Sequence, residues 1–100
     1  MTRDEHLLTI AAEECAELAQ RLSKALRFGM DEVQPGQPLS NRERIIEEYT
    51  DLIAALEMLG IWTLDRAQID AKHRKVERFL RYSEQCGTLS GGAAPAPGEE

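Results

Sequence analysis

The sequence predicts an all-α protein, an antiparallel bundle of three to four helices that dimerisation completes into four-helix packing. Apolar residues recur at helical spacing in three segments, whereas no alternating β pattern is sustained and valine occurs only at Val33 and Val76. Aromatic residues make up only 5% of the 100 residues, so the core must use the aliphatic side chains that suit long helices. The folded part is small for one isolated core, so we expect helices of a second copy to complete it.

The first predicted helix spans residues 4–27. Thr2 and Glu5 have the spacing of a capping box, in which two side chains bind backbone amides that the first turn leaves free. Gly29 follows the last helical residue, and glycine commonly ends a helix because it accepts positive φ angles. These signals at both ends define one long helix.

A loop and a second helix come next. Residues 30–39 contain two prolines and a glycine, which predicts a loop. Ser40 and Glu43 form a second capping box, and the helix that starts there is expected to run to about residue 59, before Gly60 interrupts it. The loop could be a mobile lid over a ligand, a passive connector or an arm that reaches another subunit.

The third predicted helix spans residues 64–83, where apolar residues follow Ile69 at i+7 and i+11. Residues 87–100 hold four of the seven glycines and two of the four prolines, a composition that cannot bury a core. We therefore expect one domain over residues 1–86 and a disordered tail after it.

The charge is unevenly distributed. Twelve basic and eighteen acidic residues give a net charge of −6, which argues against a protein that binds duplex nucleic acid. Residues 66–81 alone carry +4, which leaves −10 on the rest of the chain. The sequence has no apolar run of ~18 residues, so no membrane partner is expected. Cys15 and Cys86 match no zinc or disulfide-scaffold pattern, so we expect a cytoplasmic location.

Two pairs of acidic residues lie at i, i+3 spacing in the predicted helices. Glu14 lies within the apolar stripe of the first helix, and Glu17 lies one turn further on. Glu48 lies at the edge of the stripe of the second helix, with Asp51 as its i+3 neighbour. This spacing puts both members of a pair on one helical face. Two such pairs can form a cage of carboxylates between antiparallel helices.

A cage of this kind needs a cation. Buried carboxylates lose their hydration and repel one another, and a divalent cation offsets both costs. Oxygen ligands without His or Cys favour Mg²⁺, with Mn²⁺ as a substitute. A single ExxE pattern is usually a solvated helix face, so the prediction depends on finding two pairs, each with one member among apolar neighbours.

The same residues resemble a known family. The segment EECAEL over residues 13–18, followed by EEYTDL over residues 47–52, is similar to the EExxE…ExxD signature of the MazG-like all-α NTP pyrophosphohydrolases. The resemblance extends from residue 5 to about 83 and is nearest to the short, single-domain members often found in phages. The segments ALRFG (25–29) and KHRKVERFLRYS (72–83) add to it. The connection between the two motifs is longer than is usual in that family.

The resemblance implies a metal site and a reaction. The residues that match the metal-binding motif are Glu14, Glu17, Glu48 and Asp51. Arg44 lies one turn ahead of the second motif, where the family often has a basic residue. The implied reaction is Mg²⁺-dependent cleavage of a (d)NTP between the α- and β-phosphates, which gives the (d)NMP and pyrophosphate. Glu13 or Glu47 could orient or deprotonate the attacking water, or could be solvated surface residues.

Basic residues offer contacts for the phosphates. One face of the third helix could bind the β- and γ-phosphates or could be a solvated basic face; it carries Lys72, Lys75, Arg78 and Tyr82. Lys24 and Arg27, before the loop, are further candidates.

We therefore expect a homodimer or homotetramer that acts on nucleoside triphosphates. One alternative is an enzyme similar to phosphoribosyl-ATP pyrophosphohydrolase, although no ribosyl-phosphate site stands out in the sequence. The other is a non-catalytic module that binds nucleotides or partner helices.

Overall fold

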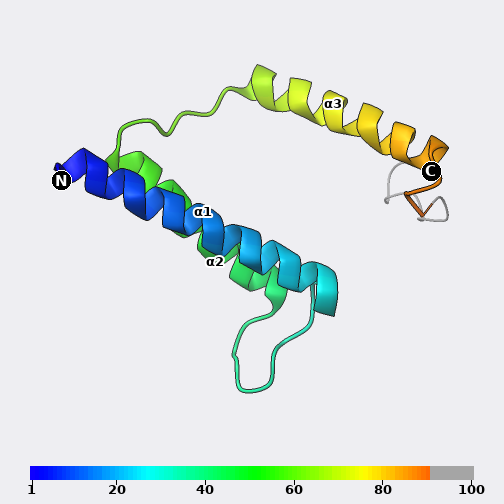
Figure 1. Cartoon of the computed structure of the whole chain (residues 1–100), viewed down its shortest axis with the longest axis horizontal. Coiled ribbons are helices and arrows are strands. Elements are labelled where there is room, and N and C mark those ends of the chain that lie inside the picture. The colour runs from blue at the N-terminus through cyan, green and yellow to red at the C-terminus, as the bar shows by residue number, and fades with distance from the viewer. Residues whose placement is uncertain (91–100) are drawn as a thin grey trace. The chain divides into compact units, whose positions relative to one another are not determined.

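The computed structural model describes residues 1–90, with 71% of them in helices and none in strands. Its three helices are α1 (Arg3–Phe28), α2 (Asn41–Met58) and α3 (Arg66–Gln85) (Figure 1). The predicted all-α class is confirmed, and the helices end within two residues of the expected positions. Most of the predicted tail, residues 91–100, lies outside the described residues.

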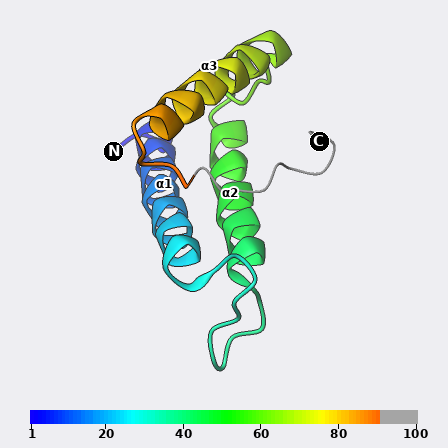
Figure 2. The ribbon, with the colours of Figure 1, turned by 90° about the vertical axis from the view of Figure 1, so that its right-hand side faces the viewer.

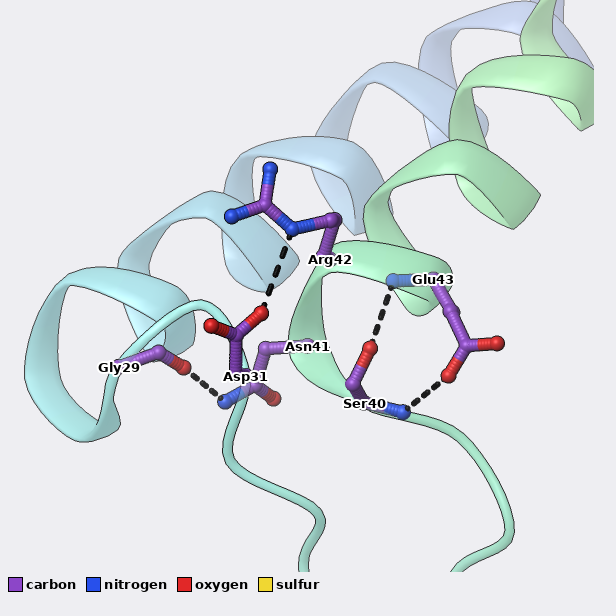
Figure 3. A network of polar contacts seen from close by, with 6 residues as sticks. All are labelled: Gly29, Asp31, Ser40, Asn41, Arg42 and Glu43. Carbon is purple, nitrogen blue, oxygen red and sulfur yellow. Dashed lines mark hydrogen bonds and ion pairs between the residues drawn. The ribbon is translucent and has the colours of Figure 1, made fainter.

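Both predicted capping boxes are present. The Thr2 amide donates to Glu5 Oε1 at 2.8 Å, and the Glu5 amide donates to Thr2 Oγ1 at 3.1 Å. The Ser40 amide donates to Glu43 Oε1 at 2.9 Å, and the Glu43 amide donates to Ser40 Oγ at 3.2 Å (Figure 3). Each pair satisfies two amides that have no partner within the helix, which is why α1 and α2 begin at these residues.

α1 and α2 form an antiparallel hairpin and lie side by side (Figure 1, Figure 2). On each helix a series of buried or half-buried positions follows heptad spacing, and we call the two series together the inner seam. On α1 the inner seam contains Leu7, Ala11, Glu14, Leu18, Arg21 and Ala25. On α2 it contains Asn41, Ile45, Glu48, Leu52 and Ala55, followed by Leu59 at the C-terminal end of the helix. Among the described residues no large side chain is fully buried, so the hairpin encloses only a small core.

The loop between α1 and α2 is closed at its base by polar contacts (Figure 3). Asn41 is only 4% exposed, and its Nδ2 donates to the Gly29 carbonyl and to Glu32 Oε1, both at 2.8 Å. Arg42 Nε donates to Asp31 Oδ1 at 3.4 Å across the same base. Gly29 adopts φ of 102°, a conformation that favours glycine, and this lets the chain leave α1. The two ends of the loop are therefore fixed to each other.

The chain divides into two compact units, Met1–Thr63 and Leu64–Glu100. The second unit contains α3, whose first turn is capped by Asp65 Oδ1, which accepts from the Gln68 amide at 3.1 Å. None of the residues of α3 is buried. The range predicted as one domain, residues 1–86, therefore includes the whole first unit and the α3 helix of the second unit. None of the helices described over residues 1–90 has the length and apolar character needed to cross a membrane.

Candidate metal centre

Three carboxylates from the two helices of the hairpin converge. Glu14 and Glu17 on α1 and Glu48 on α2 each place one oxygen so that the three atoms lie within 4.8 Å of one another. Glu14 and Glu48 are half-buried in the inner seam, whereas Glu17 is exposed. The i, i+3 spacing brings Glu17 beside Glu14, and the packing of α1 against α2 adds Glu48. The structure thus brings together three of the four predicted metal ligands, which we call the carboxylate cluster.

Two oxygens of the carboxylate cluster lack partners. Glu14 Oε2 and Glu48 Oε2 are both buried and have no hydrogen-bond partner among the described residues. Folded proteins rarely leave such atoms unpaired, because a buried polar group that has lost its water must regain a partner to recover the cost. The two atoms are therefore positioned to accept a ligand.

Burial and mutual repulsion raise the pKa of both inner-seam carboxyls. The pKa of Glu14 is raised chiefly by burial, and then by repulsion from Glu17 and Asp51. Burial is also the largest cause of the raised pKa of Glu48, followed by a hydrogen bond to Glu17 that favours the protonated form. Both groups hold their protons to higher pH than an ordinary glutamate does, and a bound cation would displace those protons.

The other acidic candidates surround the cluster. Asp51 is exposed and is not one of the three converging carboxylates, but its charge raises the pKa of both Glu14 and Glu48. Glu13 and Glu47 are exposed, and Glu13 contributes a smaller increase to the pKa of Glu14. Asp51 is thus near enough to act on the cluster electrostatically, and the flanking glutamates are accessible to water.

The donor set fits a divalent cation that prefers oxygen ligands. Oxygens bound to one Mg²⁺ lie about 3 Å apart when adjacent and about 4.2 Å apart when opposite, and those around Ca²⁺ lie up to about 4.8 Å apart, so three oxygens within 4.8 Å of one another are near enough to share an ion once the side chains adjust. The cluster found within residues 1–90 has no His or Cys member, which favours Mg²⁺ or Mn²⁺ over zinc. Glu14, Glu17 and Glu48 could hold the ion, with Asp51 beside them.

A pocket of about 410 Å³ lies at the loop end of the hairpin. Two of the predicted phosphate-binding residues line it, Lys24 and Arg27, together with Phe28 and Asn41. The Arg27 guanidinium lies 5.0 Å from the centre of the Phe28 ring, within the range of a cation–π contact. Lys24 is seven residues after Glu17, which is about 10 Å along the axis of α1. Glu32 also lines the pocket, which therefore offers two cationic side chains, one acidic side chain and an aromatic surface on the loop side of the carboxylate cluster.

The remaining basic candidates lie on α2 and α3. Arg44 is half-buried, one turn before Glu48 on α2. The four candidates on α3 are all exposed; they are Lys72, Lys75, Arg78 and Tyr82. Arg78 borders a shallow hollow of about 320 Å³ that four further side chains of α3 line, namely His73, Arg74, Glu77 and Arg81. These α3 residues form a basic surface of the second unit.

The sequence pattern missed two residues of the hairpin and misjudged a third position. Arg21 and Asn41 belong to no motif in the sequence, although both have heptad spacing from an inner-seam glutamate. The sequence predicts Glu48 at the edge of the apolar stripe of α2, but Glu48 takes the inner-seam position and its apolar neighbour Tyr49 is 49% exposed. Asn41 and Ala55 are the two buried residues of α2, whereas Ile45, Leu52 and Leu59 are half-buried, so large apolar residues alone do not mark the side of α2 that is covered.

Comparison with known proteins gave no match to a family model, to a curated protein or to a solved structure. The carboxylate cluster, the pocket at the loop end and the two acidic motifs are therefore the basis for a functional proposal.

Proposed function

We propose that this chain is a Mg²⁺-dependent nucleoside triphosphate pyrophosphohydrolase that cleaves a (d)NTP to the (d)NMP and pyrophosphate. The observation that carries the proposal is the convergence of Glu14, Glu17 and Glu48, two of which have a buried oxygen without a partner. These residues belong to the two motifs that resemble the MazG-like family. Three of the four motif residues are thus close enough to one another to share an ion, which supports the proposal.

Each group of residues has a role in this proposal. The carboxylate cluster and Asp51 hold Mg²⁺, or Mn²⁺ in its place; the ion neutralises the phosphates and makes a bound water more acidic. The acids alone would repel a triphosphate, which carries about four negative charges. Glu13 or Glu47 orients the attacking water and accepts its proton.

Basic residues of the hairpin bind the rest of the substrate in this proposal. Lys24 and Arg27 line the pocket on the loop side of the cluster, and Arg44 lies one turn before Glu48. The basic face of α3 is a second surface with the charge to bind phosphates; it carries Lys72, Lys75, Arg78 and Tyr82. Fixed cations of this kind stabilise the charge that develops on pyrophosphate as it leaves.

A nucleotide panel tests the proposal. The protein would be incubated with each NTP and dNTP, with Mg²⁺ or with EDTA, and the products would be resolved by ³¹P NMR. We expect the monophosphate and pyrophosphate, and only when Mg²⁺ is present. Absence of turnover by the folded protein, or release of orthophosphate in place of pyrophosphate, would contradict it. Including phosphoribosyl-ATP in the panel tests the related activity.

We further propose that two hairpins pack into a four-helix bundle. A second heptad series on α1, here called the outer seam, is exposed along its whole length: Leu8, Ala12, Cys15, Ala19, Leu22 and Leu26. Leu22 and Leu26 are 51% and 87% exposed, and Ile46 on α2 is 57% exposed. Small and apolar residues at heptad spacing are what a second helix packs against. Burying the outer seam would supply the core that one hairpin lacks.

The oligomer proposal is tested separately from the activity. Light scattering after size-exclusion chromatography should give a dimer or tetramer for the wild type and a monomer for Leu22→Glu. Ser23→Glu adds the same charge at the neighbouring exposed position and should leave the assembly intact. A monomeric wild type, or equal masses for the two variants, would contradict the proposed interface.

A further inference from the structure

Arg21 differs from the other basic residues of the hairpin. It is half-buried in the inner seam, and its Nη1 atom is buried without a hydrogen-bond partner among the described residues. Glu17 is one turn away at the i, i+4 spacing at which glutamate and arginine commonly pair. The ion pairs found within residues 1–90 nevertheless do not include Arg21, and Glu17 belongs to the carboxylate cluster instead. A guanidinium donor is thus left unpaired between the two helices.

The position of Arg21 relates this donor to the cluster. It lies about 6 Å beyond Glu17 along α1, towards the loop. Because α1 and α2 are antiparallel, the loop side of the cluster is also where Arg44 lies, one turn before Glu48. Lys24 and Arg27 follow on the same side, in the pocket. Four basic residues, Arg21, Lys24, Arg27 and Arg44, therefore lie on the loop side of the cluster, and Glu32 lines the same pocket as Lys24 and Arg27.

Unpaired acceptors and an unpaired donor in one interface call for a ligand that offers both charges. A metal ion satisfies the carboxylates but not Arg21, and a phosphate alone satisfies Arg21 but is repelled by the carboxylates. A metal–phosphate complex satisfies both. The planar guanidinium is also suited to a phosphate, since it can donate two parallel hydrogen bonds to phosphate oxygens.

We propose that Arg21 binds a phosphate oxygen of the substrate on the loop side of the carboxylate cluster and so fixes the direction in which the polyphosphate chain lies along α1. This inference rests on the proposed function, because it assumes that the cluster holds a metal. It assigns a substrate contact to a residue outside both acidic motifs.

The test uses Mn²⁺ alone and then imidodiphosphate, a pyrophosphate analogue that resists hydrolysis, with Mn²⁺ present. Calorimetric titrations would compare the wild type with Arg21→Met and Arg21→Gln. Arg3→Met serves as the control, since it removes the same charge from an exposed position on the same helix. We expect both Arg21 variants to bind the analogue about 10-fold more weakly or worse, with no loss of Mn²⁺ affinity. Arg3→Met should match the wild type.

Thermal unfolding without ligands separates binding from a structural role. Arg21→Met should unfold at the same temperature as the wild type or higher, because it removes a buried donor that has no partner. If Arg21 only supported the fold, this variant would unfold at a lower temperature and Mn²⁺ binding would fall with it. Failure of Arg21→Met to fold would contradict the stability prediction, and Arg21→Gln would then decide whether Arg21 contributes to binding.

The outcomes distinguish the two proposals. If the wild type binds Mn²⁺ but the Arg21 variants bind the analogue as tightly as Arg3→Met does, the inference about Arg21 is wrong and the metal centre stands. If the wild type does not bind Mn²⁺, the proposed function fails and the inference fails with it.

Discussion

Replacing Glu48 by glutamine should stabilise the metal-free protein and abolish its response to metal. Glu48 Oε2 is buried without a partner, and Glu17, Asp51 and Glu14 all repel the ionised form. Glutamine has nearly the same shape and no charge. Its amide can donate to the Glu17 carboxylate, the group whose hydrogen bonding contributes to the raised pKa of Glu48. The variant therefore resembles the protonated state of the cluster.

The expected magnitude follows from the burial of this oxygen. A buried polar group without a partner costs about 1–3 kcal/mol, and more when it is charged; glutamine keeps a polar atom at this place, so the substitution removes the cost of the buried charge and its repulsion by Glu17, Asp51 and Glu14. Because the rest of the side chain is only half-buried, solvent screening favours the lower end, about 1 kcal/mol at a pH where Glu48 is ionised. In a domain of this size that raises the melting temperature by about 4–8 °C. By contrast, Mg²⁺ at ten times its dissociation constant should add about 1.4 kcal/mol to the wild type alone.

Circular dichroism at a helix band measures both effects. Thermal unfolding would be followed at pH 8 in EDTA and at increasing Mg²⁺ for the wild type, Glu48→Gln and Glu57→Gln. Glu57 is exposed on α2 outside the cluster, so its variant should behave as the wild type does. A Glu48→Gln protein that is less stable in EDTA, or that Mg²⁺ stabilises as much as the wild type, would refute the reasoning.

Two further predictions concern pH and the loop. The pKa of both Glu14 and Glu48 is raised above 4.5 in the folded state, so the folded protein binds protons more tightly than the unfolded chain does. The free energy of unfolding of the metal-free protein should therefore fall as the pH rises from about 4.5 through the raised pKa values, and it should stay constant above them. Urea unfolding in EDTA across this range checks the sign, and stability that rises instead would contradict it. Asn41→Ala removes two side-chain hydrogen bonds that close the loop and should cost about 2 kcal/mol, measured by urea unfolding. Gln37→Ala, in the exposed part of the loop, should cost much less, and equal losses would show that Asn41 does not hold the loop base.

The helices were predictable because their ends depend on local chemistry. Thr2 with Glu5, and Ser40 with Glu43, are three residues apart, and their reciprocal hydrogen bonds need no contact with a distant part of the chain. Gly29 likewise ends α1 through its own positive φ angle. Signals of this kind can be read from a few neighbouring residues.

The environment of the carboxylate cluster was only partly predictable. The i, i+3 spacing was enough to place Glu14 and Glu17 together, and the second motif indicated Glu48. Which side of α2 faces α1 depends on the packing of both helices. Tyr49 is more apolar than its neighbour Glu48, so the sequence alone favours Tyr49 for that side. The structure instead turns Glu48 inward, and this leaves its Oε2 atom without a partner.

Arg21 and Asn41 could not be recognised from local pattern. Arginine in a helix is usually solvated, and its burial here follows from the contact between α1 and α2. Asn41 bonds to Gly29 and Glu32, which are far enough along the chain that only the closed loop brings them together. Long-range contacts of this kind depend on the fold and leave no short motif.

The most direct test of the central claim is the turnover of (d)NTPs by the wild type, Glu48→Gln and Glu57→Gln, measured as pyrophosphate released with Mg²⁺ and with EDTA. We expect the wild type and Glu57→Gln to be equally active with Mg²⁺ and inactive with EDTA. Glu48→Gln should lose at least about 100-fold while remaining fully helical. Undiminished turnover by Glu48→Gln, or by the wild type in EDTA, would contradict a metal-dependent site at the carboxylate cluster.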